Sequence, residues 1–138
     1  MTAALVILAT LFSGCPAQTA LEGEALRFAQ AWEREDTRLL REFMVETGIR
    51  LHLPGEEHVL IKPRQAQAAL DAFLEGYSGG EAQLSRASLA EGNSERGFAE
   101  IRWQTGSPGV TEPVMFTLFV AFAFEDEAWA VTEIRVLF

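Results

Sequence analysis

The chain has a single cysteine, Cys15, among its 138 residues. A disulfide needs two thiols, so no internal bridge can form within this protein. Basic residues are also scarce, because 11 Lys and Arg stand against 20 Asp and Glu and leave a formal net charge of -9. Nucleic-acid backbones are bound by clustered cations, and we therefore expect no nucleic-acid partner.

The apolar run at the N-terminus, residues 3–12, is too short to stay in a membrane as a helix. A spanning helix needs about 20 apolar residues. The shorter length is typical of the apolar part of a secretory signal peptide, which takes no part in the mature fold.

Ser13, Gly14 and Cys15 follow this run directly. A short apolar stretch, two small residues and then a cysteine resemble the lipobox of bacterial lipoproteins. The resemblance implies that residues 1–14 are removed as a signal peptide, that Cys15 carries the lipid, and that residues 15–22 form a lipidated tether. The protein would then be anchored in the bacterial cell envelope, facing the periplasm or the exterior. The alternative is that Cys15 is an incidental small residue in a secretory leader.

Residues 23–138 have the length and composition of one folded domain, because 49% of the chain is hydrophobic and ten residues are Phe. Three stretches show apolar residues at helical spacing. The first predicted helix runs from about Glu22 to Glu35, the second is short and follows Asp36 as its N-cap, and the third opens at Lys62-Pro63 and stops near Gly76.

The remaining segments alternate between apolar and polar residues with the period of a strand. A strand over residues 49–53 and a partner over residues 58–61 surround the Pro54-Gly55 turn. Four longer strands are predicted over residues 82–90, 98–104, 114–124 and 128–137. The third of these is apolar on both faces, so both faces have to be covered. We expect the helices to cover one face and a second copy of the protein to cover the other.

This order of elements resembles the nuclear transport factor 2-like superfamily, and the resemblance covers residues 23–138. It rests on the corner Ala31-Trp32-Glu33-Arg34-Glu35-Asp36, with Glu35 where the family usually has glycine, on residues 49–55 and on the closing segment 129–136. Residues 64–74 look most like envelope members of the superfamily. The resemblance implies an α+β fold in which three N-terminal helices pack on a curved antiparallel sheet that forms a cone. Members include steroid isomerases, SnoaL-like cyclases, dehydratases and dimeric binding modules, so the fold does not settle the function.

His52 is the one candidate for a catalytic residue. Aligned on the Pro54-Gly55 turn, His52 comes close to the position of the basic aspartate of the isomerases, and its imidazole suits proton transfer. The strand that carries the acid partner in that family reads Val120-Ala121-Phe122-Ala123-Phe124 and offers no polar group. A histidine on the polar side of a half-exposed strand is the alternative interpretation of His52.

No metal or cofactor is expected. His58 could be paired with His52, but two histidines around a turn fall short of the ligand number that zinc needs. The chain also lacks a phosphate-binding glycine loop and a nucleophile elbow.

Four aromatic residues, Trp32, Phe73, Trp103 and Phe119, could line an apolar pocket for a lipid or another apolar small molecule. The alternative is that they are ordinary core residues. We therefore expect a membrane-anchored lipoprotein whose domain binds a ligand or a protein without enzymatic activity, as a homodimer. A small isomerase, cyclase or hydrolase that uses His52 is the alternative function.

Overall fold

The computed structural model describes residues 16–138, so the predicted signal peptide and Cys15 lie outside the described residues. The helices are α1 (Pro16–Glu33), α2 (Thr37–Phe43) and α3 (Pro63–Leu74). The strands are β1 (Ile49–Leu53), β2 (Glu56–Ile61), β3 (Ser78–Ala90), β4 (Asn93–Gly106), β5 (Val114–Glu125) and β6 (Ala128–Leu137). Within residues 16–138 no helix has both the length and the apolar character required to span a bilayer.

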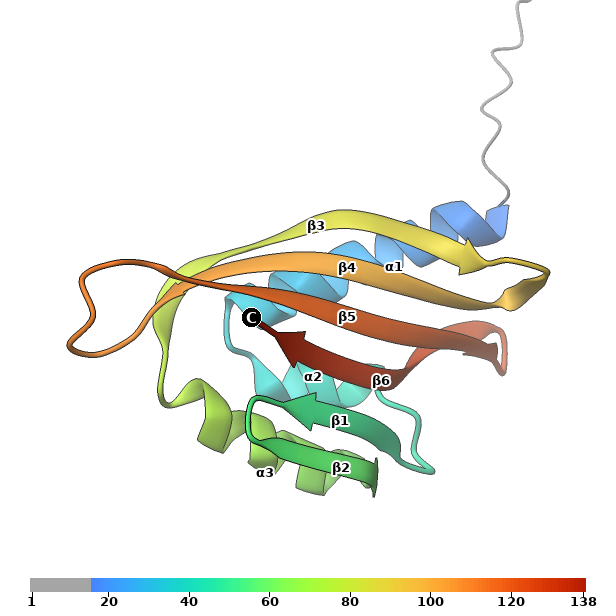
Figure 1. Ribbon diagram of the computed structural model, residues 1–138. Coiled ribbons are helices and arrows are strands. Elements are labelled where there is room, and N and C mark those ends of the chain that lie inside the picture. The colour runs from blue at the N-terminus through green and yellow to red at the C-terminus, as the bar shows by residue number, and fades with distance from the viewer. Residues whose placement is uncertain (1–15) are drawn as a thin grey trace, which may run out of the picture.

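The six strands form one curved sheet in the order β2-β1-β6-β5-β4-β3, and the three helices lie against one of its faces (Figure 1). Neighbouring strands are antiparallel except β1 and β6, which run parallel and pair Arg50 with Glu133 and His52 with Arg135. The predicted α+β fold, with three helices packed on a curved sheet, is confirmed. The sheet is mixed because of the one parallel pair, which the sequence pattern did not indicate.

The first helix begins at Pro16, earlier than the sequence pattern predicted. Residues 16–22, expected to be a tether, belong to the helix because their side chains have partners in the sheet. Leu21 is completely buried, and the Gln18 side chain donates to the carbonyl of Ala87 at 2.7 Å and accepts from the amide of Leu89 at 3.2 Å. These contacts attach the first turns of α1 to β3.

The corner between α1 and α2 has the geometry of a Schellman motif. The amide of Glu35 donates to the carbonyl of Trp32, and the amide of Asp36 donates to the carbonyl of Ala31. Glu35 has a φ of 56°, a left-handed conformation that favours glycine. Asp36 then caps α2, as predicted, because its carboxylate accepts from the amide of Leu39 at 3.1 Å.

Among the irregularities of the sheet, one lies at the start of β3 and another in β6. β3 starts at Ser78 and contains Gly80 with a φ of 105°, where a Cβ atom would lie 1.9 Å from the carbonyl oxygen of Gln104. In β6 the pairing with β5 shifts between Ala121 and Phe122, so that Thr132 is an extra residue on β6. The shift lets β6 direct apolar residues inward on both sides of the bulge. They are Trp129 and Val131 before it, and Ile134 and Val136 after it.

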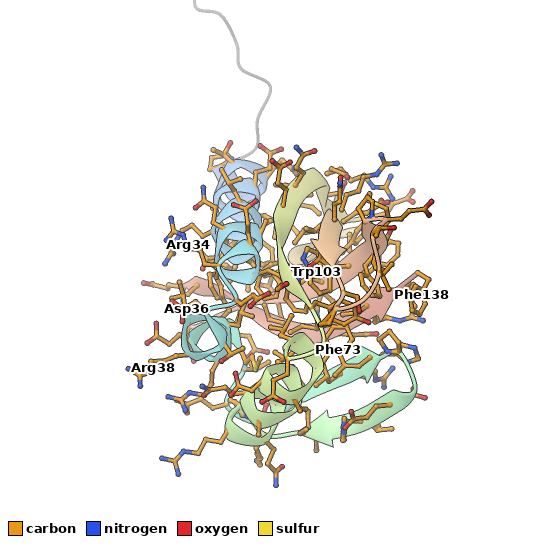
Figure 2. All side chains as sticks on the ribbon, turned by 90° about the vertical axis from the view of Figure 1, so that its left-hand side faces the viewer. Arg34, Asp36, Arg38, Phe73, Trp103 and Phe138 are labelled. Carbon is orange, nitrogen blue, oxygen red and sulfur yellow. The ribbon has the colours of Figure 1, made fainter. Side chains whose placement is uncertain are left out.

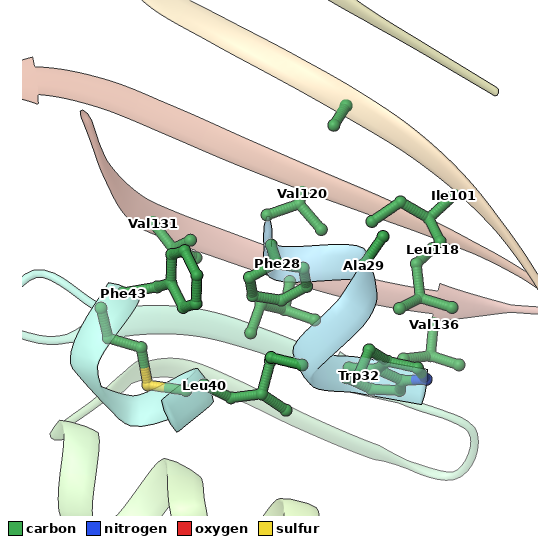
Figure 3. Packing of buried hydrophobic residues seen from close by; sticks show 14 of the residues in the cluster. Phe28, Ala29, Trp32, Leu40, Phe43, Ile101, Leu118, Val120, Val131 and Val136 are labelled. Carbon is green, nitrogen blue, oxygen red and sulfur yellow. The ribbon is translucent and has the colours of Figure 1, made fainter. Parts of the chain in front are cut away.

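The core lies between the helices and the inner face of the sheet (Figure 3). Phe28 of α1 packs its ring against Phe43 of α2 at 5.5 Å and against Phe122 of β5 at 6.4 Å. In β5 the even-numbered residues Phe116 to Phe122 face this core, and Met115 on the opposite face is 50% exposed. The alternation predicted for this strand is confirmed from Phe116 to Phe122. It is wrong at the end of the strand, where Ala123 is 2% exposed and Phe124, expected on the inner face, is 39% exposed.

Candidate functional site

The interior of the cone is filled by aromatic side chains from four elements. Trp32 of α1 meets Trp103 of β4 edge to face with ring centroids 5.4 Å apart. Phe73 of α3 lies 6.0 Å from Trp103, and Figure 2 shows both between the helices and the strands. Tyr77, which follows α3, and Phe116 of β5 each have ring centroids within 5.4 Å of the Trp103 ring. We call these five residues the aromatic cluster.

The aromatic cluster brings together three of the four residues predicted to line a pocket, but their rings contact one another. Trp32 and Trp103 are 0% and 1% exposed, which supports the alternative that they are core residues. The fourth, Phe119, was wrongly grouped with them, because it alternates with the inward residues Leu118 and Val120 and so lies on the opposite face of the sheet. Tyr77 and Phe116 were missed, and the position of Tyr77 just after a helix-ending glycine gave no periodic signal.

No carboxylate, imidazole, ammonium or guanidinium group is fully buried in the described part of the interior, and Tyr77, which is half-buried, contributes a phenol to the aromatic cluster. Among residues 16–138 the buried polar or charged residues are Thr37 and Thr105, which are 8% and 2% exposed. The Thr37 hydroxyl donates to Asp71, and the Thr105 hydroxyl donates to the carbonyl of Gly79 at 2.9 Å. Both hydroxyls thus hold local structure, and no acid and base face each other there, as isomerisation through an oxyanion would need.

His52 does not face the interior. Its neighbours Leu51 and Leu53 are 0% and 1% exposed and point inward, so His52 projects from the outer face of the sheet. There it pairs with Glu57 of β2 on one side and Arg135 of β6 on the other. This position disfavours the alternative enzyme that uses His52 in the cone.

His58 pairs with Leu51 of β1 and His52 pairs with Glu57 of β2, so the two histidines occupy consecutive pairs of the β1–β2 hairpin and belong to opposite faces of the sheet. The ring nitrogen of His58 lies 2.5 Å from a carboxylate oxygen of Glu56, its near neighbour in β2. No group of three or more metal-ligating side chains occurs within the described residues.

The outer face of the sheet combines apolar and charged side chains in rows that cross the strands. The central row runs from β2 to β3 and contains Glu57, His52, Arg135, Phe119, Glu100 and Arg86. The row beside it contains Arg50, Glu133, Ala121, Phe98 and Ser88. A hollow of about 190 Å³ lies between the two rows and is lined by Phe98, Phe119, Ala121, Glu133 and Arg135. We call these two rows the outer sheet face.

Charges on the outer sheet face are arranged in pairs of opposite sign. Arg86 lies 3.4 Å from the carboxylate of Glu100, and its guanidinium is 5.9 Å from the centroid of the Phe98 ring. Arg135 lies 3.7 Å from Glu133. These pairs surround Phe98, which is 38% exposed although it is large and apolar.

The fold is that of solved ketosteroid isomerase-like structures, and it is the fold that the resemblance to the nuclear transport factor 2-like superfamily predicted. A ketosteroid isomerase-like protein from Erwinia carotovora atroseptica superposes with a TM-score of 0.72, at 12% identity, over 88% of this chain and 95% of that one. A DUF4783 family protein from Bacteroides uniformis superposes with a TM-score of 0.66, at 15% identity, over 82% and 93%.

A protein with this fold from Catenulispora acidiphila, crystallised in complex with trimethylamine, superposes with a TM-score of 0.64, at 12% identity, over 83% of this chain and 85% of that one. No protein-family model matches the chain, and no curated protein matches its sequence. At these identities the likeness establishes the fold and leaves the activity to be argued from the residues.

Proposed function

We propose that the protein is a membrane-anchored interaction module that acts without enzymatic chemistry and pairs with a second copy of itself through the outer sheet face. The contrast between the two faces of the sheet carries this proposal. The inner face is closed by the aromatic cluster and holds no buried acid or base among the described residues. The outer sheet face offers exposed apolar side chains and balanced charges.

Charge balance favours self-association through this face. A chain with a net charge of -9 repels its own copies unless the contact surface is close to neutral. In the outer sheet face each glutamate has an arginine counterpart, so the two rows carry no formal net charge with His52 neutral. In a twofold dimer the same surface meets itself, and acids of one copy can then face bases of the other. The charged residues are Glu57, Glu100, Glu133, Arg50, Arg86 and Arg135.

The apolar side chains of the outer sheet face can form the desolvated centre of a dimer interface. Aromatic residues in a desolvated centre carry much of the binding energy in protein interfaces. Phe98 of β4 pairs directly with Ala121 of β5, and Phe119 lies two residues before Ala121 on the same face of β5. The small side chain of Ala121 lets a partner approach both rings. The proposed interaction surface is thus the outer side of the curved sheet, with a hollow of about 190 Å³ in it.

The membrane anchor in this proposal is a lipid on Cys15. Its support is the short apolar run followed by Ser13, Gly14 and the single cysteine of the chain. A diacylglycerol brings two acyl chains, which is the number that holds a protein stably on a membrane. The protein would be located in the bacterial cell envelope, facing the periplasm or the exterior.

Light scattering coupled to size-exclusion chromatography tests the dimer. The wild-type chain is expected to have twice the monomer mass, and Ala121→Arg is expected to be monomeric because it adds a buried charge at the centre of the interface. Ala68→Arg is the matched control, since Ala68 is exposed on α3, away from the outer sheet face. A wild-type protein that remains monomeric at the highest concentration reached, or equal masses for the two variants, contradicts the proposed interface.

Mass spectrometry of the protein isolated from bacterial membranes tests the anchor. The expected N-terminal peptide starts at Cys15 and carries the mass of the lipid, and a Cys15→Ser variant lacks it. An unmodified thiol at Cys15 in the wild-type protein contradicts the anchor and leaves the dimer proposal untouched.

A further inference from the structure

A hollow separate from the aromatic cluster and from the outer sheet face lies between the end of α2 and the start of α3. It has a volume of about 540 Å³, within the range of small-molecule pockets. Two segments that are distant in the sequence form it, because one wall comes from residues 41–46 and the other from residues 62–64. We call this hollow the α2–α3 hollow.

Three cations converge on the α2–α3 hollow, although the chain has only 11 basic residues. They are Arg41 of α2, Lys62 directly before α3 and Arg64 in the first turn of α3. None of the three forms an ion pair with a carboxylate within residues 16–138. The Lys62 ammonium donates to the carbonyl of Thr47 at 3.2 Å, a neutral partner that leaves its charge uncompensated. The three charges are therefore available to an anion from outside the described chain.

The start of α3 also departs from the usual charge preference of a helix. The N-terminal end of a helix is positive, so acids in the first turn stabilise it and cations destabilise it. In α3 the first turn has no acid, and the N-cap residue Lys62 makes no side-chain capping hydrogen bond. Arg64 adds a second cation at this end. Folded proteins break such local preferences mainly at functional sites, and a bound anion would remove this conflict.

The α2–α3 hollow has an apolar wall beside its cations. Met44, which is 5% exposed, and the half-buried Pro63 line it. The methylene groups of the lysine and arginine side chains extend this apolar surface. An occupant that uses the whole hollow therefore combines an apolar body with an anionic group.

Two carboxylates limit the charge of the occupant. Glu42 and Glu46 also line the α2–α3 hollow, and both are exposed. Together with the three cations they leave one positive charge in excess, which a single negative charge matches. A carboxylate carries one negative charge at pH 7, whereas a phosphate monoester carries close to two. An arginine guanidinium can also bind a carboxylate through two parallel hydrogen bonds.

We propose that the α2–α3 hollow binds an organic monocarboxylate with an apolar body, of the chemical class of a medium-chain fatty acid. Lys62 and Arg64 bind the carboxylate, and the alkyl chain lies against Met44 and Pro63. The site requires neither the lipid on Cys15 nor the dimer, and its test is independent of both.

Isothermal titration calorimetry of the full chain with octanoate tests this site. Acetate lacks the apolar body and 1-octanol lacks the charge, so each is expected to bind at least about tenfold more weakly than octanoate. A Lys62→Gln/Arg64→Gln double variant is expected to lose about tenfold in affinity for octanoate. Arg34→Gln/Arg38→Gln is the matched control. It removes the same charge, and both arginines project from the α1–α2 corner and do not line the hollow (Figure 2).

Thermal unfolding without ligand separates lost binding from lost structure. The Lys62→Gln/Arg64→Gln variant is expected to melt at or above the temperature of the wild type, because it removes cations from the positive end of α3. Equal octanoate affinities in the two double variants overturn the site, as does a wild-type protein that does not bind octanoate. Acetate or 1-octanol binding as tightly as octanoate contradicts the proposed class of ligand.

Discussion

The indole rings of Trp32 and Trp103 meet edge to face, with centroids 5.4 Å apart and planes at 84°, and join α1 to the centre of the sheet. This contact stands in the middle of the core. Here the two buried rings fill the space between the helical layer and the sheet and hold the two layers together.

Removal of the Trp103 ring should therefore lower the free energy of unfolding. Trp103→Ala is expected to lower the free energy of unfolding by about 3–5 kcal/mol, because the ring is 1% exposed and its loss leaves a cavity. Phe119→Ala, on the outer face, should have a much smaller effect in the isolated monomer. Urea unfolding followed by circular dichroism measures both variants, and equal losses would contradict the assignment of the two residues to opposite faces.

Glu35 is strained by its place at the end of α1. It adopts a φ of 56° as the left-handed residue of the Schellman motif, and its carboxylate lies at the negative end of the helix dipole. Glu35→Gly is expected to raise the free energy of unfolding by about 0.5–1 kcal/mol. Glu35→Ala removes the charge and keeps the Cβ atom, so it should gain less than Glu35→Gly. Thermal and urea denaturation of the wild type and of the two variants measure these differences in the free energy of unfolding.

Gly79 and Gly80 are adjacent glycines with different constraints. A Cβ atom at Gly79 meets nothing within 4 Å, whereas one at Gly80 lies 1.9 Å from the carbonyl oxygen of Gln104. Both have positive φ, so alanine costs about 1 kcal/mol of backbone strain at either position. Gly80→Ala should additionally separate β3 from β4 and be clearly more destabilising than Gly79→Ala. Hydrogen exchange of the β3 amides measures the separation, and similar exchange in the two variants would refute it.

Alanine substitutions of His52 and Leu51 test which side chains of β1 face the core. Leu51→Ala is expected to cost about 2–5 kcal/mol, because Leu51 is fully buried. His52→Ala should stay within about 0.5 kcal/mol of the wild-type free energy of unfolding in the isolated monomer. If His52→Ala proved as costly as Leu51→Ala, the histidine would have to face the core.

Much of the fold follows from local patterns in the sequence. Helical spacing indicates α3, the N-cap residue Asp36 marks the start of α2, and the alternation over residues 116–122 separates the two faces of β5. The boundaries that were missed depend on distant partners. The first turns of α1 are polar and small, and their helical state becomes evident only from the contacts of Gln18 and Leu21 with the sheet.

The site was less predictable because it depends on which face of the sheet the helices cover. Alternation shows that Phe119 and Phe116 lie on opposite faces, but it does not say which face is inside. The same ambiguity applied to His52, whose outward position follows from the burial of Leu51 and Leu53. A period of two assigns residues to faces, and only tertiary packing assigns the faces to the core or to solvent.

In the parallel pairing of β1 with β6, Arg50 lies beside Glu133, a residue far from it in the sequence. The β1–β2 hairpin has no other neighbour in the sheet, because β2 forms the edge. During folding this hairpin has an unpaired strand border until β6 has formed and docks beside it, and such long-range closure slows folding.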